Sequence, residues 1–354
     1  MDEAVRNEGF NPRRRNFLGT AALGIAAAPL GLAGSASAAP AGAPPLAGGM
    51  SPASHTFADI RQIHAGLLDV GYVDTGPADG QAVVLFHGWP YDIHAFIDVA
   101  PILAAAGYRV IIPHLRGYGT TRFLDVATPR NGQQASFTAD AVAFIDALKI
   151  DKAIVAGFDW GARIATTLAA LWPQRFIGLV SVSGYLIGSQ EANRKPLSPK
   201  AELQWWYQYY FATPRGELGY RENTHAFARL IWELASPQWQ FDDATFARSA
   251  RSLDNPDHVA ISVGNYRWRL GLAPGEDRYA SLERRLAAFP DVTVPAITME
   301  GDANGAPHPD PKAYAKKFRG RYEHRHLDGG IGHNLPQEAP RAFAQAILDV
   351  AKLV

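Results

Sequence analysis

Short apolar runs alternate, from residue 57 onward, with segments that have the spacing of amphipathic helices. Residues 83–86 and 153–158 are apolar along their whole length, which is typical of strands buried on both faces of a sheet. Residues 138–148 place their apolar side chains three and four positions apart, which predicts a helix with one buried side. This alternation predicts a mostly parallel sheet flanked by helices, an α/β fold.

The elements predicted for this α/β part follow one another in a regular order. Strands are predicted at residues 68–74, 83–86, 108–113, 153–158, 177–183, 294–299 and 322–327. Helices are predicted at residues 96–106, 138–148, 162–172, 314–318 and 340–353.

The alternation stops between residues 186 and 285, a stretch rich in Trp, Tyr and Arg. Helices are predicted here at residues 200–211, 218–235 and 243–252. The simplest arrangement is an α/β core, formed by residues 56–185 and 286–354, with a helical cap inserted at 186–285.

Composition and charge exclude several classes of protein. The chain has no Cys, so disulfides, thiolate catalysis and Cys-ligated metals are excluded. It has 34 Lys+Arg and 34 Asp+Glu, without the basic excess of a nucleic-acid-binding protein. No spaced cluster of His and acidic residues demands a metal, so we expect neither a metal nor a cofactor.

The N-terminal segment has the layout of an export signal. Arg14 and Arg15 precede an Ala/Gly/Leu run, and small residues close the segment near Ala38. The arginine pair resembles the twin-arginine type. We therefore expect residues 1–38 to be a signal, residues 39–55 to be a flexible lead-in, and the mature protein to be periplasmic or extracellular and not bound to a membrane. The alternative is an Ala-rich extension of a cytosolic enzyme.

The most informative motif is Gly157-Phe158-Asp159-Trp160-Gly161, between a predicted strand and a predicted helix. It has the form of a nucleophile elbow, in which small flanking residues tolerate a strained turn. The central residue is Asp, and no G-x-S-x-G exists in the chain. A carboxylate attacks sp³ carbon and forms an ester, which favours epoxides or alkyl halides as substrates. The alternative is an Asp that caps the helix.

The motif His87-Gly88-Trp89-Pro90 follows an earlier buried strand. This turn must bring a backbone N–H toward the nucleophile, so we expect a cis peptide bond at Pro90. The backbone N–H groups of Trp89 and Trp160 would then form an oxyanion hole.

Two motifs near the end of the chain supply a base and an acid. His333 follows the last predicted strand and can activate water. Asp302 closes the penultimate strand and can orient His333, with Asp310 as the fallback. All these motifs lie at carboxyl ends of strands, where sheets of this kind bind ligands.

With these motifs, residues 56–354 resemble the epoxide hydrolase and haloalkane dehalogenase branch of the α/β-hydrolase superfamily. The resemblance implies a capped α/β-hydrolase fold and hydrolysis through an aspartyl ester. It also implies that two cap tyrosines protonate the epoxide oxygen, and it nominates Tyr207 and Tyr266. Tyr209 or Tyr210 could replace Tyr207, because the sequence does not fix the helical register. The expected partners are an apolar small-molecule epoxide and water.

Two other functions remain open. A haloalkane or haloacid dehalogenase would bind halide with the Trp160 indole and a second donor such as Trp205 or Trp206. Fluoroacetate dehalogenases resemble this elbow in having an Arg where this chain has Arg163. They also carry Arg where this chain has Trp160, so a surface or salt-bridged role is expected for Arg163. The other function is a non-catalytic binding protein on this fold. One departure from the superfamily is His114, at a position usually held by Asp.

Overall fold

The computed structural model describes residues 56–353. The predicted signal at residues 1–38 and the lead-in at residues 39–55 lie outside the described residues. None of the helices within residues 56–353 is both long enough and apolar enough to cross a membrane.

A mixed, mostly parallel sheet forms the centre of the described chain, in the order β1-β2-β4-β3-β6-β7-β8-β9, with β5 paired to β2. The pairs β1–β2, β2–β4 and β2–β5 are antiparallel, and the other pairs are parallel. The strands are β1 (Arg61–Ala65), β2 (Leu68–Thr75), β3 (Ala82–Phe86), β4 (Arg109–Pro113), β5 (Arg122–Phe123), β6 (Ala153–Gly157), β7 (Phe176–Val182), β8 (Ala296–Gly301) and β9 (Tyr322–Leu327).

The fully apolar strands lie in the middle of this sheet, as the sequence predicts. Every residue of β3 and β6 is buried, because helices cover both faces of the sheet there. Phe86 pairs with Gly157 at the carboxyl ends of these two parallel strands. This register brings the turn after β3 beside the turn after β6, although the two are far apart in sequence.

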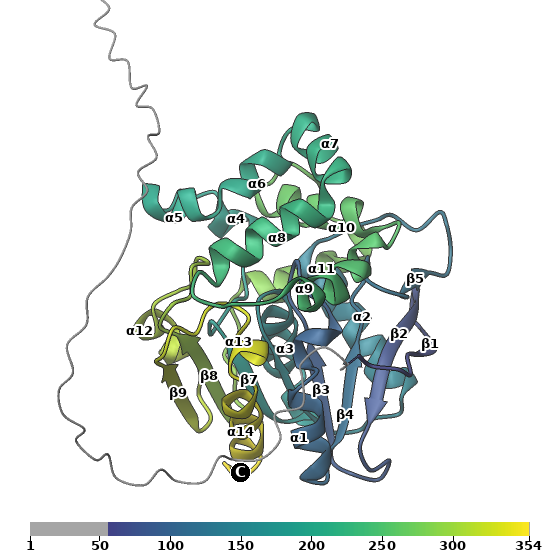
Figure 1. Ribbon diagram of the computed structural model, residues 1–354, viewed down its shortest axis with the longest axis vertical. Coiled ribbons are helices and arrows are strands. Elements are labelled where there is room, and N and C mark those ends of the chain that lie inside the picture. The colour runs from purple at the N-terminus through teal and green to yellow at the C-terminus, as the bar shows by residue number, and fades with distance from the viewer. Residues whose placement is uncertain (1–55, 354) are drawn as a thin grey trace, which may run out of the picture. The chain divides into compact units, whose positions relative to one another are not determined.

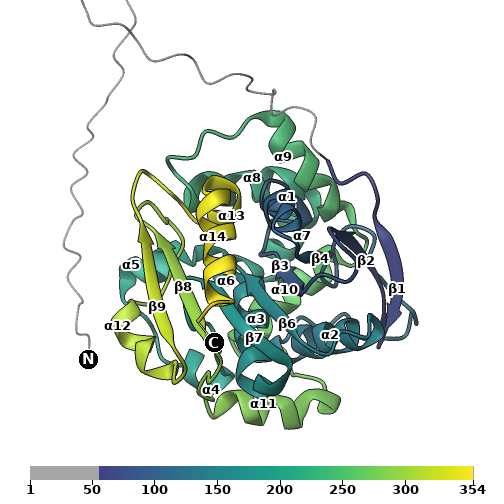
Figure 2. The same cartoon turned by 90° about the horizontal axis from the view of Figure 1, so that it is seen from below.

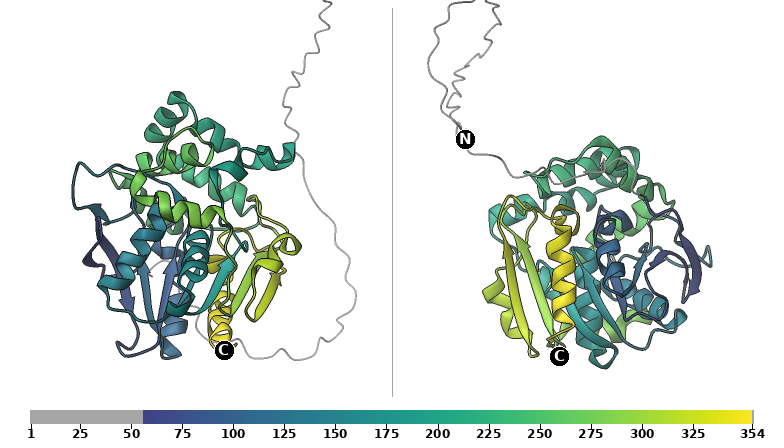
Figure 3. Two further views of the ribbon diagram at one scale, coloured as in Figure 1. Left: turned by 180° about the vertical axis from the view of Figure 1, so that it is seen from behind. Right: turned by 60° about the horizontal axis from the view of Figure 1, so that its bottom comes forward.

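Helices pack on both faces of the sheet. Figure 2 shows α1 and α14 on one face and α2 and α3 on the other. The view from behind, on the left of Figure 3, shows β8 and β9 at one edge of the sheet and β1 and β2 at the opposite edge. The helices of the core are α1 (Val99–Ala105), α2 (Gln134–Ala147), α3 (Trp160–Leu171), α12 (Pro311–Tyr314), α13 (Leu335–Glu338) and α14 (Pro340–Val350).

Between β7 and β8 the described chain forms helices and no strand. Figure 1 shows most of this helical segment, in teal and green, above the ends of the strands. Its α-helices are α4 (Gln190–Asn193), α5 (Pro199–Gln204), α6 (Trp206–Phe211), α7 (Pro214–Glu222), α8 (Thr224–Ala235), α9 (Asp243–Ala250), α10 (His258–Arg269) and α11 (Ala280–Ala287).

The helical segment differs in detail from the prediction. The helix predicted at 200–211 breaks at Trp205, and the helix predicted at 218–235 begins earlier and breaks at Asn223. The earlier start has a local cause: the hydroxyl of Thr213 accepts from the backbone of Gly216, and Pro214 occupies the first turn. Helix α10, which carries Tyr266, has no counterpart in the prediction.

Candidate active site

The turn between β6 and α3 holds Asp159 in a conformation that side chains rarely adopt, with φ 52° and ψ −121°. Both glycines of the motif are required by close packing. A Cβ atom at Gly161 would lie 1.8 Å from the carbonyl oxygen of Phe86, and one at Gly157 would lie 2.5 Å from the backbone of Gly161. The elbow is therefore locked against the end of β3.

The carboxylate of Asp159 does not cap helix α3, although Asp159 occupies the N-cap position. Its Oδ1 accepts a hydrogen bond from the backbone N–H of Trp89 at 2.8 Å. Its Oδ2 lies 3.5 Å from Nε2 of His333. Burial raises the pKa of Asp159, but His333 and the backbone N–H groups of Trp89 and Trp160 outweigh burial and hold the pKa below its usual range. The helix-capping alternative therefore has no support, and the carboxylate is an anion at neutral pH.

The turn after β3 has the expected cis peptide bond between Trp89 and Pro90. Nε1 of the Trp89 indole donates to the hydroxyl of Tyr220 at 3.1 Å, and that hydroxyl lies 2.7 Å from Nε2 of His258. Burial lowers the pKa of His258 to about 3, so this histidine stays neutral. This buried chain fixes the Trp89 ring, and with it the backbone N–H that contacts Asp159.

His333 is oriented by Asn304, a residue that the sequence did not single out. Nδ1 of His333 lies 3.2 Å from Oδ1 of Asn304, whose Nδ2 donates to Oε1 of buried Glu300 at 2.6 Å. A carboxylate only accepts hydrogen bonds, so Glu300 turns the amide nitrogen of Asn304 toward itself. The amide oxygen then faces Nδ1, which must carry a proton, and Nε2 is the ring nitrogen that faces Asp159.

The predicted role of Asp302 is wrong, because its carboxylate does not contact His333. Instead it accepts from the backbone N–H groups of Gly329, Gly330 and Ile331 at 2.9–3.0 Å. Asp302 immediately follows β8 and turns toward the loop after β9, while Asn304, two residues later, reaches the imidazole. Asn304 lies three residues after the end of β8, close enough to reach the imidazole, and this position could be read from the sequence. It was overlooked because only carboxylates were considered as partners of the histidine.

The fallback acid, Asp310, makes no hydrogen bond to His333 either. Its Oδ1 accepts from the backbone of Lys312 and caps helix α12. The structure therefore offers Asn304, supported by Glu300, as the partner of the histidine.

Tyr207 on α6 and Tyr266 on α10 line the same cavity as Asp159 and His333. Their ring centres are 5.2 Å apart, and each ring lies 5.1 Å from the ring of Trp89. Burial, with an added contribution from the charge of Asp159, raises the pKa of both phenols, so both are protonated at neutral pH. Both can donate a hydrogen bond into the cavity.

The two alternative tyrosines point elsewhere. Tyr209 is 47% exposed and donates to Glu202. Tyr210 stacks on Phe227, with ring centres 5.8 Å apart. Neither lines the cavity, so of the tyrosines on α6 the structure presents Tyr207 to Asp159.

The cavity has a volume of about 450 Å³ and is walled largely by aromatic and aliphatic side chains. The charged residues in its wall are Asp159, Arg163 and Arg269, apart from histidines. The indole of Trp160 does not line it, and no described residue accepts from its Nε1. Apolar wall residues are Trp89, Leu186, Ile187, Leu197, Trp205, Trp206, Ile231, Leu234 and Trp268.

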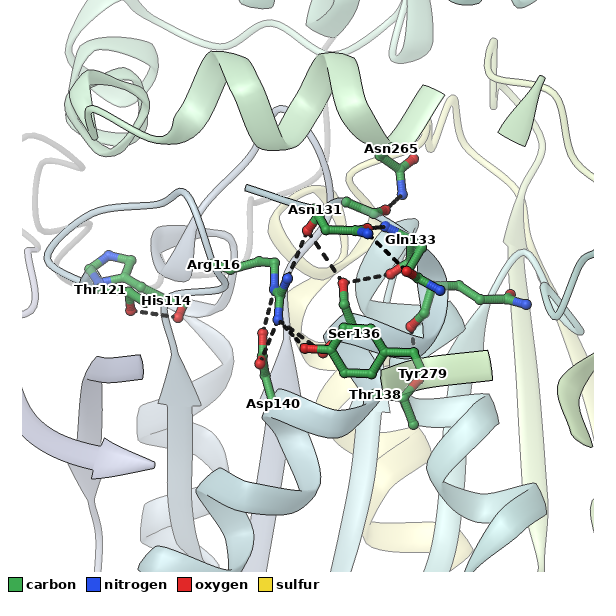
Figure 4. A network of polar contacts seen from close by, with 12 residues as sticks. His114, Arg116, Thr121, Asn131, Gln133, Ser136, Thr138, Asp140, Asn265 and Tyr279 are labelled. Carbon is green, nitrogen blue, oxygen red and sulfur yellow. Dashed lines mark hydrogen bonds and ion pairs between the residues drawn. The ribbon is translucent and has the colours of Figure 1, made fainter. Parts of the chain in front are cut away.

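A buried ion pair ties the core to the helix that carries Tyr266 (Figure 4). Arg116 donates to both oxygens of Asp140 at 2.6 and 2.7 Å and to the carbonyl of Asn131 at 2.7 Å. The next loop residue, Gly132, accepts from Nδ2 of Asn265 at 2.6 Å. The loop held by Arg116 thus anchors α10 one residue before the tyrosine.

His114 plays no part in the cavity. It is buried, and burial lowers its pKa to about 3, so it is a neutral packing residue beside Gly119. Within residues 56–353 no group of three or more His, Asp or Glu is placed to hold a metal ion.

Comparisons with known proteins agree with this fold. The sequence profile of the alpha/beta hydrolase fold matches residues 81–226. Epoxide hydrolase B of Mycobacterium tuberculosis is 36% identical over 149 residues, 39% of this chain, and the match spans only 41% of that protein. Haloalkane dehalogenase of Mycobacterium marinum is 31% identical over 223 residues, which cover 60% of this chain and 71% of that protein.

One solved structure matches this chain over nearly the whole of its own length. The crystal structure of a candidate epoxide hydrolase from Klebsiella pneumoniae is 65% identical to this chain, with a TM-score of 0.83. The match covers 84% of this chain and 98% of that one. From its fold, its elbow and these relatives, the chain belongs to the α/β hydrolase fold family.

Proposed function

We propose that this chain hydrolyses epoxides to vicinal diols through an ester on Asp159. The proposal rests on one observation: an ionised Asp at the elbow, a His beside it and two cap tyrosines line the same cavity. The names of the epoxide hydrolases that the chain resembles support the same reaction.

The first half-reaction opens the ring. Oδ1 of Asp159 is already held by the Trp89 N–H, so the free oxygen, Oδ2, attacks an epoxide carbon while the carbon–oxygen bond on its far side breaks. The ring oxygen leaves as an alkoxide and takes a proton from Tyr207 or Tyr266. An alkoxide is a poor leaving group, so this proton donor is essential to the rate.

The second half-reaction frees the diol. Nε2 of His333 takes a proton from water, and the resulting hydroxide attacks the ester carbonyl carbon. The oxygen that becomes the oxyanion is Oδ1, which already lies 2.8 Å from the backbone nitrogen of Trp89. The tetrahedral intermediate then breaks the bond between its carbon and the substrate oxygen, and that oxygen takes the proton of the imidazolium. This leaves Asp159 as a carboxylic acid, whose proton returns to the tyrosinate, so that one epoxide and one water give one diol.

The aromatic and aliphatic wall supports an apolar body for the substrate.

Intact-protein mass spectrometry of a His333→Gln variant tests the proposal. Without the base, the ester should accumulate, and the mass should rise by that of the whole epoxide. A His333→Gln/Asp159→Asn variant is the matched control and should gain no mass. If no epoxide in a broad panel adds to Asp159, the proposed reaction is wrong.

A dehalogenase reaction is the second candidate, and the observation in its favour is the Trp160 indole. Its Nε1 is buried and has no acceptor within hydrogen-bond distance among the described residues, although the indole is not part of the cavity wall. The relative from M. marinum is named a haloalkane dehalogenase. In the same trapping experiment a haloalkane would add only its alkyl group, without the halogen.

We also propose that residues 1–38 direct export by the twin-arginine route. The proposal rests on the Arg14-Arg15 pair and the apolar run after it. A bacterial host with a functional twin-arginine translocase should release a chain that begins near Ala39. An Arg14→Lys/Arg15→Lys variant should stay in the cytoplasm with its N-terminus intact.

A further inference from the structure

Two arginine side chains share the cavity with Asp159 and lack an acidic partner in the described part of the chain. Arg163 lies one helical turn after the elbow on α3, and Arg269 is the last residue of α10. Nε of Arg163 donates to the carbonyl of Leu186 at 3.0 Å, and the guanidinium of Arg269 lies 3.8 Å from the ring centre of Trp205. Neither contact neutralises the positive charge, so the salt-bridged role expected for Arg163 is wrong.

The buried Arg116 shows how this fold otherwise handles such a group, since it is paired with Asp140. A guanidinium removed from water without a carboxylate lowers the stability of the fold. Burial, and then repulsion from Arg163, lower the pKa of Arg269 to about 9. Two positive charges in the wall of one cavity would be stabilised by an anion between them.

Asp159 does not remain available as that anion during the reaction. It is the one carboxylate among the described residues of the cavity wall. Once Asp159 forms an ester, its negative charge is lost, and Arg163 and Arg269 face the bound substrate with no counter-charge. A negative group on the substrate itself would balance them throughout the reaction.

We propose that the cavity binds epoxides that carry a carboxylate, held by Arg269 and Arg163, with the apolar body of the substrate against the aromatic wall. The epoxide part of this inference rests on the proposed function. A guanidinium matches a carboxylate with two parallel hydrogen bonds, which gives both affinity and orientation. Arg269 also lies 5.8 Å from the ring centre of Tyr266, so the carboxylate sits close to the epoxide ring.

Paired substrates test the proposal by kinetics. The probes are 3-phenyloxirane-2-carboxylate and its primary amide, which differ in charge but little in shape. We expect the wild type to favour the carboxylate by about 100-fold in kcat/KM. Arg163→Met and Arg269→Met should each reduce this preference by about 10-fold or more. Arg269→Lys should keep part of the preference that Arg269→Met loses, since lysine retains the positive charge but cannot form the two parallel hydrogen bonds of a guanidinium.

The matched control is Arg194→Met, because Arg194 is exposed and pairs with Glu191 outside the cavity. It should keep the full preference for the carboxylate. A wild-type ratio near one, or arginine variants that keep the wild-type ratio, would overturn the proposal. If Arg269→Met lowers kcat/KM for the carboxylate and the amide substrates equally, Arg269 positions the tyrosines and does not bind the substrate carboxylate. The proposal also fails in that case.

Calorimetry with an unreactive pair separates this proposal from the proposed function. Phenylacetate should bind the wild type and phenylacetamide should bind much more weakly, and the Arg163→Met/Arg269→Met variant should lose the difference. If phenylacetate binds in this way while Asp159 never forms an ester with an epoxide, the anion site stands and the epoxide reaction is wrong. Equal binding of acid and amide would overturn the anion site. Thermal melting of each variant checks that it is folded.

Discussion

Asn304 holds the imidazole of His333, with 3.2 Å between Oδ1 and Nδ1, in the place where a carboxylate was expected. Glu300 fixes the direction of that amide through a hydrogen bond of 2.6 Å. A misdirected amide in such a position would hold the imidazole in the wrong tautomer, which is known to be severely damaging to catalysis. Here the buried carboxylate one step further away prevents that error.

Replacing Asn304 by Ala should slow hydrolysis of the ester more than its formation, because His333 acts in the second half-reaction. We expect about a 10- to 100-fold loss in that step and a larger steady-state fraction of ester, measured by rapid quench and mass spectrometry. Asp302→Ala is the control, because its carboxylate holds a loop and does not contact the histidine. If Asp302→Ala accumulates ester and Asn304→Ala does not, the assignment of Asn304 is wrong.

Removing the hydroxyls of Tyr207 and Tyr266 should affect ring opening. Each single Phe variant should form the ester about 10- to 100-fold more slowly, and the double variant should lose at least about 100-fold, the usual contribution of a general acid. Single-turnover kinetics with an epoxide measures this step. Tyr209→Phe is the matched control on the same helix and should keep the wild-type rate. Loss of activity in that control alone would mean that the register of α6 is wrong.

Ester formation by the wild type should show no acid limb between about pH 5 and pH 8. Burial raises the pKa of Asp159, but His333 and two backbone N–H groups lower it more, so the net pKa lies below the usual value. A lowered pKa means that the carboxylate is ionised throughout this range. Burst amplitudes and rates measured across the range check the prediction. A fall in burst rate centred near pH 6 would show that the pKa of Asp159 is raised.

Gly161→Ala should destabilise the elbow, because its Cβ would lie 1.8 Å from the carbonyl oxygen of Phe86. Overpacking of this kind typically lowers the free energy of unfolding by about 1–3 kcal/mol. Gly264→Ala on α10 is the matched control, since its Cβ would meet nothing closer than 3.5 Å and Ala favours helices. Urea unfolding compares the two. Equal stability of both variants would show that the elbow is not tightly packed.

Asp140→Asn should break the ion pair with Arg116 and leave a buried positive charge. The expected loss in the free energy of unfolding is about 3–5 kcal/mol. Glu191→Gln removes an exposed ion pair with Arg194 and should change stability by less than about 1 kcal/mol. Denaturant unfolding distinguishes them, and a small effect of Asp140→Asn would contradict the anchoring role of the Arg116 network.

The alternation of strands and helices along the core from β2 onward, apart from the short strand β5, and the identity of the elbow could be predicted from the sequence. Both depend on neighbours a few residues apart. The apolar run of β6 fixes a buried strand, and Gly157 and Gly161 flank Asp159 because only glycine fits where β3 approaches. Tyr207 could be nominated by resemblance, but its orientation on α6, with Tyr209 turned outward, depends on how the helix packs.

The partner of His333 and the pair of arginines were decided only by the tertiary structure. Asp302 and Asn304 are two residues apart after β8, and the backbone path of that loop determines which of them reaches the imidazole. Arg163 and Arg269 come from the core and the cap, more than 100 residues apart in the chain. Their spacing in the sequence does not indicate that they share a cavity. They do so because the packing of α10 over the sheet brings both charges into one cavity wall.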